Sequence, residues 1–304
     1  MDSILNFIGG KSLSAKKIVE AIPEHQCYVE PFAGALWVLF QKQTSKVEVI
    51  NDINGELINF WRVIQRQHNE FIERGKYEMY SRELHHEYYT DFDSGKHFKL
   101  SNLERAFRFF YLIKASFASK FGSSWGFGPS RNMGDSFFNE FKIIDQIAER
   151  LKHIQIDNKD FQSVIEDYDR EYTFTFIDPP YIKTNVDEQY FKSMEANNVI
   201  GFTLNDHQRL FNTLSKIKGK FLLTIDDSFF IRERYCEGEQ GSKGFYWIEN
   251  EVAYSSMDKN SRRHVTELII TNYDTKEVIK QNKLKKEKEK QIKLVGNSKS
   301  LADY

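Results

Sequence analysis

Short apolar runs alternate along the chain with segments whose apolar residues recur at helical spacing. The runs predict buried strands at Cys27–Glu30, Lys46–Ile50, Ile154–Ile156, Thr173–Ile177 and Lys220–Ile225. Apolar residues three or four positions apart predict helices at Leu36–Gln43, Leu57–Gln67, Leu103–Lys114, Phe138–Arg150, Gln162–Ile165 and Phe202–Lys218. Strands that alternate with helices in this way predict an α/β fold with a mostly parallel sheet.

The last two predicted strands, Tyr246–Tyr254 and Val265–Thr271, lie too close in sequence for a crossover helix between them. Such strands pair antiparallel, because a parallel connection takes roughly a dozen residues or more. The expected architecture is therefore Rossmann-like, a mostly parallel sheet with an antiparallel edge hairpin. From Asp274 the chain is rich in Lys, Glu and Gln, which predicts a charged tail that is frayed or partly helical.

Composition narrows the class of protein. The 304 residues carry a net charge of −1, so any basic surface must be local. Cys27 and Cys236 lie far apart and no Cys/His group has metal-site spacing, so neither a disulfide framework nor a metal site is expected. Because the sequence shows no signal segment and no apolar stretch of membrane-spanning length, we expect a reduced, cytoplasmic setting without a membrane partner.

The stretch Thr173–Tyr181 ends a predicted strand on Asp-Pro-Pro-Tyr. Pro179 has no N–H for a sheet ladder, so the strand must stop at Asp178. This places a carboxylate and the Tyr181 phenol at the edge where open α/β sheets bind ligands. The Asp178 carboxylate and the Pro179 carbonyl can accept from the amino group of a base, and Tyr181 can stack on its ring. The alternative is a strand-ending turn with no chemistry.

Small residues mark two further places where a ligand can approach the backbone. A Gly-Gly pair precedes Lys11, and Pro31–Ala35 follows the strand that ends at Glu30. The Gly-Gly pair can alternatively belong to an ordinary N-terminal turn. Asp52 follows the next strand, where an acidic residue usually holds ribose hydroxyls. The loop has one glycine, Gly34, in place of the three of the dinucleotide fingerprint, so it suits S-adenosylmethionine better than NAD. Asp52 can alternatively cap the following helix.

Asp160 and Phe161 stand where a loop meets a predicted helix. A carboxylate and an aromatic ring in this position can hold an adenine by its amino group and its face. The alternative makes Asp160 a helix N-cap and Phe161 a core residue.

Glycine, serine, aromatic and basic residues alternate in the loop Ala115–Asn132. Such a loop can place hydroxyl and N–H groups on phosphates and an aromatic wedge between bases, or it can pack without a partner. The candidate nucleic-acid contacts are Lys114, Ser116, Lys120, Trp125 or Phe127 as the wedge, Arg131 and Asn132. The basic turn Met257–His264 can face a phosphate backbone or be solvated.

Taken in order, these motifs resemble the Dam-like N6-adenine DNA methyltransferases. The motifs are Phe7–Lys11, Glu30–Gly34, Asn51-Asp52, the aromatic Ser/Gly insert, Asp160-Phe161, Asp178–Tyr181 and Glu267–Tyr273. The resemblance implies the fold of S-adenosylmethionine-dependent methyltransferases with an inserted, mainly helical DNA-recognition domain. It implies a catalytic, cofactor-binding domain at 1–60 and 150–273, a target-recognition domain at 61–149 and a charged tail at 274–304.

The resemblance also implies roles for the matching residues. Asp178, Pro179, Pro180 and Tyr181 would hold a flipped-out adenine for methyl transfer to N6, without a metal or a covalent intermediate. S-adenosylmethionine is the implied cofactor and double-stranded DNA the implied partner. The residues implied to bind the cofactor are Phe7, Gly10, Lys11, Glu30, Phe32, Gly34, Asp52, Asp160, Phe161 and Asp178.

Other functions stay open at this point. Any exocyclic amino group suits the same acceptors, so N4-cytosine methylation is an alternative, although aspartate rather than serine at position 178 favours adenine. An RNA substrate and a catalytically idle DNA-binding protein of the same fold are further alternatives. A restriction endonuclease is a candidate partner in the cell.

Overall fold

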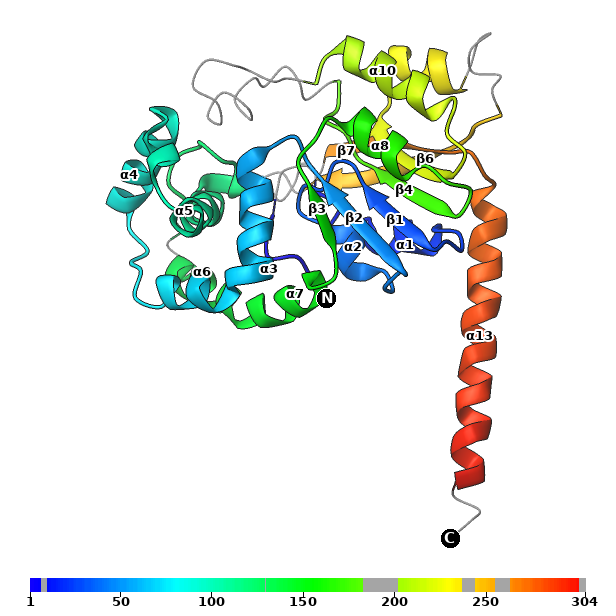
Figure 1. Ribbon diagram of the computed structural model, residues 1–304, viewed down its shortest axis with the longest axis horizontal. Helices are drawn as coiled ribbons and strands as arrows, with labels where there is room; N and C mark the ends of the chain where they lie inside the picture. Colours follow the sequence, from blue (N-terminus) through cyan, green and yellow to red (C-terminus); the bar gives the residue numbers. More distant parts are fainter. Residues whose placement is uncertain (7–9, 129, 183–201, 237–243, 255–262, 301–304) are drawn as a thin grey trace.

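The computed structural model describes residues 1–6, 10–128, 130–182, 202–236, 244–254 and 263–300. A twisted sheet forms the centre of the molecule (Figure 1). Helices α3 to α7 gather beyond the β3 edge of the sheet, and α13 projects as a rod from the other end (Figure 1). The predicted Phe7 site and most of the predicted basic turn, residues 257–262, lie outside the described residues.

Within the described residues, seven strands form one sheet in the order β3-β2-β1-β4-β5-β7-β6. β1 to β5 run parallel, and β7 and β6 add an antiparallel hairpin at one edge. The predicted mostly parallel sheet with an antiparallel edge hairpin is therefore confirmed. The strands are β1 (Cys27–Glu30), β2 (Val47–Asn51), β3 (Gln155–Asp157), β4 (Thr173–Ile177), β5 (Lys220–Asp226), β6 (Tyr246–Tyr254) and β7 (Arg263–Thr271).

Strands β1 and β4 are neighbours at the centre of the sheet, but the chain leaves them in opposite directions. After β1 it moves outward to β2 and β3, and after β4 it moves the other way to β5. The carboxyl ends of β1 and β4 therefore border the crevice in which sheets of this kind bind ligands. The Asp178–Tyr181 motif follows β4 directly and so lies at this edge.

Most predicted helices are present, with shifted ends. The α-helices are α1 (Ala15–Glu20), α2 (Trp37–Gln41), α3 (Gly55–Gly75), α4 (Arg82–Asp93), α5 (Asn102–Ala115), α6 (Met133–Asn139), α7 (Ile144–Leu151), α8 (Phe161–Tyr168), α10 (Leu204–Leu214), α11 (Phe229–Ile231) and α13 (Thr275–Ser300). Shorter helical turns are η1 (Lys96–Lys99), η2 (Phe117–Ser119), η3 (Glu140–Ile143) and η4 (Arg232–Cys236). The single helix predicted at 138–150 is wrong, because α6, η3 and α7 share this region.

Helices α3 and α4 depart further from the prediction. The sequence predicts a helix that ends near Gln67, whereas α3 continues to Gly75 with Gln67 in a non-helical conformation. It predicts no regular period between residues 77 and 99, whereas α4 begins there after Ser81, whose side chain accepts from the Glu83 N–H. Helix α4 buries His85, Tyr88 and Phe92. These residues have helical spacing, but histidine and tyrosine mask the apolar stripe that a sequence pattern registers.

The core lies on both faces of the sheet. Leu222 of β5 belongs to the larger apolar cluster, which includes α1, α2, α3 and α5, whereas Phe221 and Leu223 belong to a second cluster with α8 and α10. Successive residues of a strand point to opposite faces, so a strand buried on both sides reads as a continuous apolar run. This is why the central strands could be predicted nearly to the residue.

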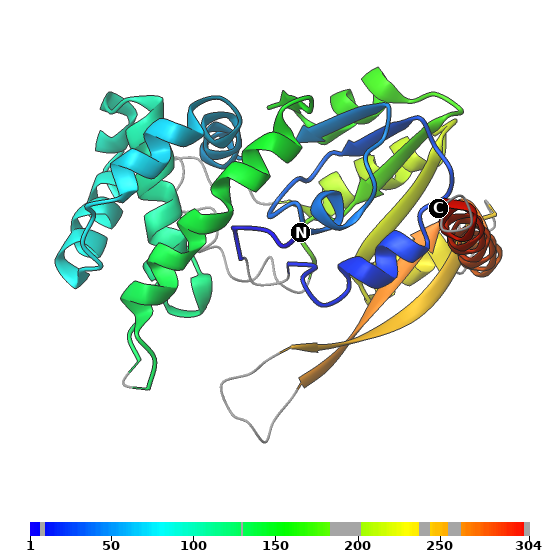
Figure 2. The same cartoon turned by 90° about the horizontal axis from the view of Figure 1, so that it is seen from below.

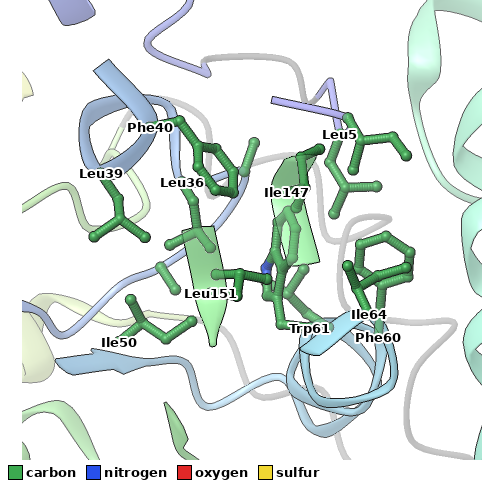
Figure 3. Close-up of a cluster of buried hydrophobic side chains, with 14 of the residues drawn as sticks. Leu5, Leu36, Leu39, Phe40, Ile50, Phe60, Trp61, Ile64, Ile147 and Leu151 are labelled. Atoms are coloured by element: carbon green, nitrogen blue, oxygen red, sulfur yellow. The ribbon is translucent and has the colours of Figure 1, made fainter. Parts of the chain in front are cut away.

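Helix α3 joins the sheet to the helices of the predicted recognition region. Trp61 packs edge-on against Phe40 of α2. Figure 3 shows Trp61 in one apolar cluster with Leu36, Leu39 and Ile50. The preceding residue, Phe60, stacks on Phe110 of α5 with ring centres 5.9 Å apart. Two consecutive residues of one helix therefore contact both parts of the molecule.

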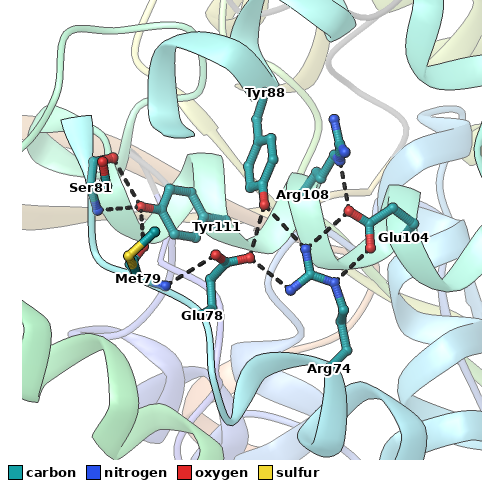
Figure 4. Close-up of polar contacts among 8 residues, drawn as sticks. All are labelled: Arg74, Glu78, Met79, Ser81, Tyr88, Glu104, Arg108 and Tyr111. Atoms are coloured by element: carbon teal, nitrogen blue, oxygen red, sulfur yellow. Dashed lines mark hydrogen bonds and ion pairs between the residues drawn. The ribbon is translucent and has the colours of Figure 1, made fainter. Parts of the chain in front are cut away.

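A polar network fixes α4 against α3 and α5 (Figure 4). The Arg74 guanidinium lies between Glu104 of α5, at 2.7 Å, and Glu78, also at 2.7 Å, and it donates to the hydroxyl of Tyr88. Arg108 extends the network by pairing with Glu104. Arginine holds two carboxylates at once because its donors form a planar fork.

The tail is more ordered than predicted. Residues 275–300 form the single helix α13, whereas the sequence predicts a frayed or partly helical segment. Lysine, glutamate and glutamine are good helix formers, so a continuous helix agrees with intrinsic propensity.

Candidate active site

The residue that ends β4 meets a lysine from the start of the chain. Lys11 Nζ lies 2.9 Å from Asp178 Oδ1 and donates to Tyr181 Oη at 2.7 Å. The same ammonium lies 4.9 Å from the centre of the Tyr181 ring. The Lys11 side chain is 5% exposed, so this contact is shielded from solvent. Lys11 is 167 positions from Asp178 in sequence, and these contacts hold it against the Asp178–Tyr181 motif.

Two residues from the other half of the sheet complete this group. Thr224 of β5 donates its hydroxyl to Asp178 Oδ1 at 2.8 Å. Glu267 of β7 is 1% exposed and lies 3.7 Å from Lys11 Nζ. Both Lys11 and Thr224 contact Oδ1, and no contact to Oδ2 of Asp178 is found among the described residues. Oδ2 is therefore the oxygen that can accept from a ligand.

The charge on Asp178 depends on these neighbours. Burial raises the pKa of the Asp178 carboxyl above its usual value, whereas the Lys11 charge and the hydrogen bonds from Lys11 and Thr224 lower it. The negative charge of Glu267 raises the same pKa. An adjacent cation favours the charged carboxylate, so Lys11 is the main group that keeps Asp178 able to accept hydrogen bonds.

The segment after the motif is tied to the next strand. The Ile182 N–H donates to Asp226 Oδ1 at 2.9 Å, and Asp226 is the last residue of β5. Pro179 is buried and Pro180 is half-buried between these fixed points. The position of the whole motif is therefore set by β4, β5 and the N-terminal loop together.

Asp52 orders the small-residue loop after β1. Its Oδ2 accepts from the Gly34 N–H at 3.1 Å and its Oδ1 from the Asn54 N–H at 3.0 Å. Gly34 has a φ of +46°, which glycine adopts without strain, and an added Cβ there would meet nothing within 4 Å. The alternative that Asp52 caps α3 is wrong, because the Asn54 side chain accepts from the first N–H groups of that helix.

The same loop carries a strained residue and an anchor. Leu36 adopts a φ of +59°, which is unusual for a residue with a side chain and is found where the surroundings impose it. The Gly34 carbonyl accepts from Trp61 Nε1 at 3.1 Å. The backbone of this loop is thus fixed from β2 and from α3, while one side of Gly34 stays open.

Glu30, the last residue of β1, is 1% exposed. Its Oε1 accepts from the Tyr28 hydroxyl, whereas its buried Oε2 has no hydrogen-bond partner among the described residues. Burial raises the pKa of Glu30 to about 8, and the Tyr28 hydrogen bond and the Lys42 charge oppose this. A buried oxygen without a donor is costly unless a ligand supplies one.

Asp160 and Phe161 sit at the start of α8. Asp160 caps the helix through the Gln162 N–H and accepts from Arg209 at 2.7 Å. Phe161 is buried and stacks on Phe32 with ring centres 5.4 Å apart. The simpler alternative, an N-cap and a core residue, is thus confirmed as their structural role. Their contact with a cofactor stays a prediction.

The predicted nucleic-acid residues divide into internal and surface positions. The Lys114 side chain is 7% exposed and pairs with Glu140 at 2.8 Å, and removal from solvent lowers its pKa. Ser116 is buried and bonds with His85 Nε2 at 2.8 Å. Both side chains therefore hold the protein together rather than face solvent. The Lys120 side chain is half-buried.

The tip of the same loop is exposed. Trp125 is half-buried against Tyr80, at 4.3 Å between ring centres, whereas Phe127 is 72% exposed. Arg131 is exposed and donates to Ser136, and Asn132 caps α6. Of the two predicted wedges, Phe127 is the one presented to solvent.

Sequence reasoning assigned no role to several residues that shape the site. Thr224 and Glu267 are polar residues inside apolar strands, which is the signal that would have found them. Asn51, also at a strand end, is fully buried and bonds to the Lys159 N–H and carbonyl, which ties the loop before α8 to β2. Gly10 is half-buried and is placed directly before Lys11.

The described residues contain no group of His, Cys, Asp or Glu side chains suited to a metal ion. The two cysteines, Cys27 and Cys236, do not form a disulfide. Among the same residues, no helix has both the length and the apolar content that crossing a bilayer demands.

Comparison with known families identifies the chain. The model of the D12 class N6 adenine-specific DNA methyltransferases matches residues 7–256. The chain belongs to this family. It is therefore an N6-adenine DNA methyltransferase, which confirms the resemblance seen in the motifs and leaves the N4-cytosine alternative without support.

Several relatives of this D12 class enzyme match along most of its length. A type II methyltransferase M1.LlaDCHI of Lactococcus lactis subsp. cremoris is 29% identical, over 87% of this chain and 93% of the relative. A type II methyltransferase M.CviBI of Paramecium bursaria Chlorella virus NC1A is 27% identical, over 90% and 100%. A DNA adenine methylase of Vibrio cholerae serotype O1 is 26% identical, over 70% and 76%.

Proposed function

We propose that Asp178, Pro179, Pro180 and Tyr181 form the catalytic site and that S-adenosylmethionine binds at the ends of β1 and β2. The observation that carries the proposal is the arrangement of Asp178. Its Oδ1 is held by Lys11 and Thr224, and its Oδ2 is left for substrate. A carboxylate so oriented, at the switch point of the sheet, is placed to accept from a base.

The adenine amino nitrogen is a weak nucleophile because its lone pair is delocalised into the ring. Hydrogen bonds from this amino group to Asp178 Oδ2 and to the Pro179 carbonyl favour a pyramidal nitrogen with an available lone pair. The carboxylate must be ionised to act in this way, and Lys11 serves as the positioning residue that keeps it so. Catalysis then comes from orientation and charge placement.

The residues at the ends of β1 and β2 fit S-adenosylmethionine. Glu30 has a buried oxygen with no hydrogen-bond partner found among the described residues, and Gly34 has an open side next to a backbone fixed by Asp52. Each Asp52 oxygen keeps a lone pair for a ribose hydroxyl. Phe32 and Phe161 would border the adenine. When bound, the cofactor supplies an electrophilic sulfonium methyl group.

Asp178 is only 21% exposed, which excludes a base that remains stacked in a duplex. The target adenine must therefore be flipped out, with Tyr181 as its stacking partner. Tyr181 is held in place by its hydroxyl, which accepts from Lys11.

The DNA duplex is proposed to lie beside the loop that joins α5 to α6. This loop and the β6–β7 hairpin project from the same side of the molecule (Figure 2). Phe127 is exposed at the loop, with the Arg82 guanidinium 5.7 Å from its ring centre, and Arg131 lies nearby in sequence. Phe127 would act as the wedge, and the arginines would contact phosphates.

Substitution of Asp178 tests the catalytic assignment. Asp178→Ala is expected to abolish methyl transfer to DNA while cofactor affinity in calorimetry stays within a few fold. Asp167→Ala on the surface of α8, where the side chain is 53% exposed, is the matched control and should keep wild-type activity. Near wild-type methylation by the purified Asp178→Ala protein would overturn the assignment.

Two relatives are named type II methyltransferases, which supports a restriction endonuclease as a partner of this enzyme in the cell. Base-resolution mapping of N6-methyladenine in cells that express the protein gives the target sequence. Protection of that sequence from a co-expressed endonuclease then tests the partnership.

A further inference from the structure

Helix α13 concentrates positive charge at one end of the molecule. Residues 275–300 contain nine lysines and three glutamates, which leaves a net charge of −7 on the rest of the chain. The lysines whose side chains are described, at positions 276, 280, 283, 285, 286 and 288, are all exposed. Solubility does not require such separation of charge between a body and its tail.

Among the residues of α13 whose side chains are described, those of the first turns contact the body. Val278 and Ile279 pack against the larger apolar cluster, and Asn282 Nδ2 donates to the carbonyls of Glu20 and Ile22 at 2.9 Å. Lys285 pairs with Glu24 at 3.5 Å. From Lys286 to Glu289 every side chain is exposed, and the helix continues away from the sheet (Figure 1).

The exposed part of α13 suits a polyanion better than an apolar partner. Between Lys280 and Glu289 the one apolar residue is Leu284, which is 49% exposed. A coiled-coil seam needs apolar residues at two positions in each heptad, and a membrane-surface helix needs an apolar face. A lysine-rich helix without either feature is complementary to a phosphate backbone.

Helix α13 leaves the sheet at the end of the strands opposite to the catalytic site. In the β5–β7 pair, Glu267 of the site faces Asp226, whereas Thr271 faces Leu222 near the other end. Helix α13 begins four residues after Thr271, so it leaves from the edge opposite to Asp178. The recognition helices α4 to α6 lie at the far end of the molecule from α13 (Figure 1).

We infer that α13 is a tether that binds the phosphate backbone of a second DNA segment while the catalytic site holds the first. The inference rests on DNA as the substrate. It gives long DNA a second attachment point, whereas a single short duplex held in the catalytic site offers no second segment. The enzyme is then retained on long DNA between methylation events, and its release depends on salt.

Charge changes within α13 test the tether without touching the site. Lys280, Lys283, Lys286 and Lys288 are replaced together by glutamine, which keeps helix propensity and leaves the Lys285–Glu24 pair intact. The control replaces Glu277, Glu287 and Glu289 by glutamine, which raises the charge of the same helix. Affinity for plasmid-length DNA without target sites is measured as a function of salt. Methylation is measured in parallel on a duplex of about 20 base pairs with one target, which is long enough for a specific interface but offers no second segment.

The lysine variant should bind long DNA at least tenfold more weakly, with a salt slope reduced by as much as about 0.9 per lysine. The glutamate variant should bind it more tightly, and both should methylate the short duplex like wild type. Unchanged affinity of the lysine variant for long DNA overturns the tether. This is the result expected if α13 binds an acidic protein instead of DNA. An equal loss on the short duplex also overturns it, because α13 would then contact the DNA in the site. Failure of the catalytic assignment appears separately, as an active Asp178→Ala enzyme.

Discussion

At the scale of single residues, the site is a balance of buried charges around Asp178. One ammonium, Lys11, contacts the carboxyl groups of both Asp178 and Glu267. An opposite charge favours the ionised form of Asp178, and a like charge disfavours it. The ionisation of Asp178 is therefore sensitive to both neighbours.

Two substitutions should therefore shift the pH dependence of methylation in opposite directions. Lys11→Met removes the charge that lowers the pKa of Asp178, so the acidic limb of kcat/KM should move to higher pH. Glu267→Gln removes the charge that raises this pKa, so the limb should move to lower pH. Thermal unfolding at neutral pH controls for loss of structure. Shifts of the same sign in both variants would contradict these electrostatic roles.

Asp52 predicts a pH dependence for cofactor binding. Burial raises the pKa of Asp52 to about 6, so the side chain becomes protonated as the pH falls through this value. A neutral acid accepts more weakly from ribose hydroxyls than a carboxylate. Affinity for S-adenosylmethionine, measured by calorimetry between pH 5 and 7, should fall with decreasing pH in wild type. In Asp52→Asn it should be weaker and nearly constant, and an unaltered pH dependence would remove Asp52 from the pocket.

At the scale of elements, α3 connects the loop after β1, where we propose that the cofactor binds, to α5 of the predicted recognition region. Trp61 donates to the Gly34 carbonyl while Phe60, on the adjacent position, stacks on α5. We therefore expect a shift of α5 to reach the backbone of the loop through these two adjacent residues of α3. This connection exists because α3 begins four residues after β2 ends at Asn51.

Trp61→Phe tests this connection. The variant keeps most of the buried ring but leaves the Gly34 carbonyl without its donor, which should cost about 1–3 kcal/mol in the free energy of unfolding. Cofactor affinity should fall as well, because the loop loses an anchor. Trp247→Phe at the exposed sheet edge is the control and should change neither quantity measurably. Denaturant unfolding and calorimetry provide the two measurements, and unchanged cofactor affinity with lowered stability would exclude the connection.

At the scale of the whole molecule, one apolar cluster runs from the sheet into the recognition helices. It includes Phe174 of β4 and Leu222 of β5 together with Phe110 and Phe137 of the helical region. A shared core predicts that the two regions unfold together, although their sequences suggest separate domains. The boundaries predicted at residues 60 and 150 therefore do not separate two independent apolar cores.

Phe110→Ala tests the shared core. Removal of this fully buried ring should cost about 3–5 kcal/mol, and cofactor binding and near-ultraviolet circular dichroism should be lost in the same denaturant transition. Phe110→Leu is the milder variant in case the alanine protein does not fold. Two separate transitions, with cofactor binding preserved in the first, would show that the recognition helices fold on their own.

The sequence alone determined the central strands, the antiparallel hairpin and the family. A strand buried on both faces is a continuous apolar run, and Asp178 ends its strand because Pro179 cannot join a ladder. The motif Asp178–Tyr181, which we propose to be catalytic, could be found because its residues are adjacent in sequence.

Tertiary structure decided which polar residues work together. Lys11, Thr224 and Glu267 come from three distant segments, and only the strand order brings them to Asp178. The structure places Lys114 and Ser116 inside the protein and Phe127 in solvent. The sequence does not show this, because a basic or hydroxyl side chain occurs both at internal and at exposed positions. Pairing and burial are properties of distant contacts, which a local pattern of residues does not encode.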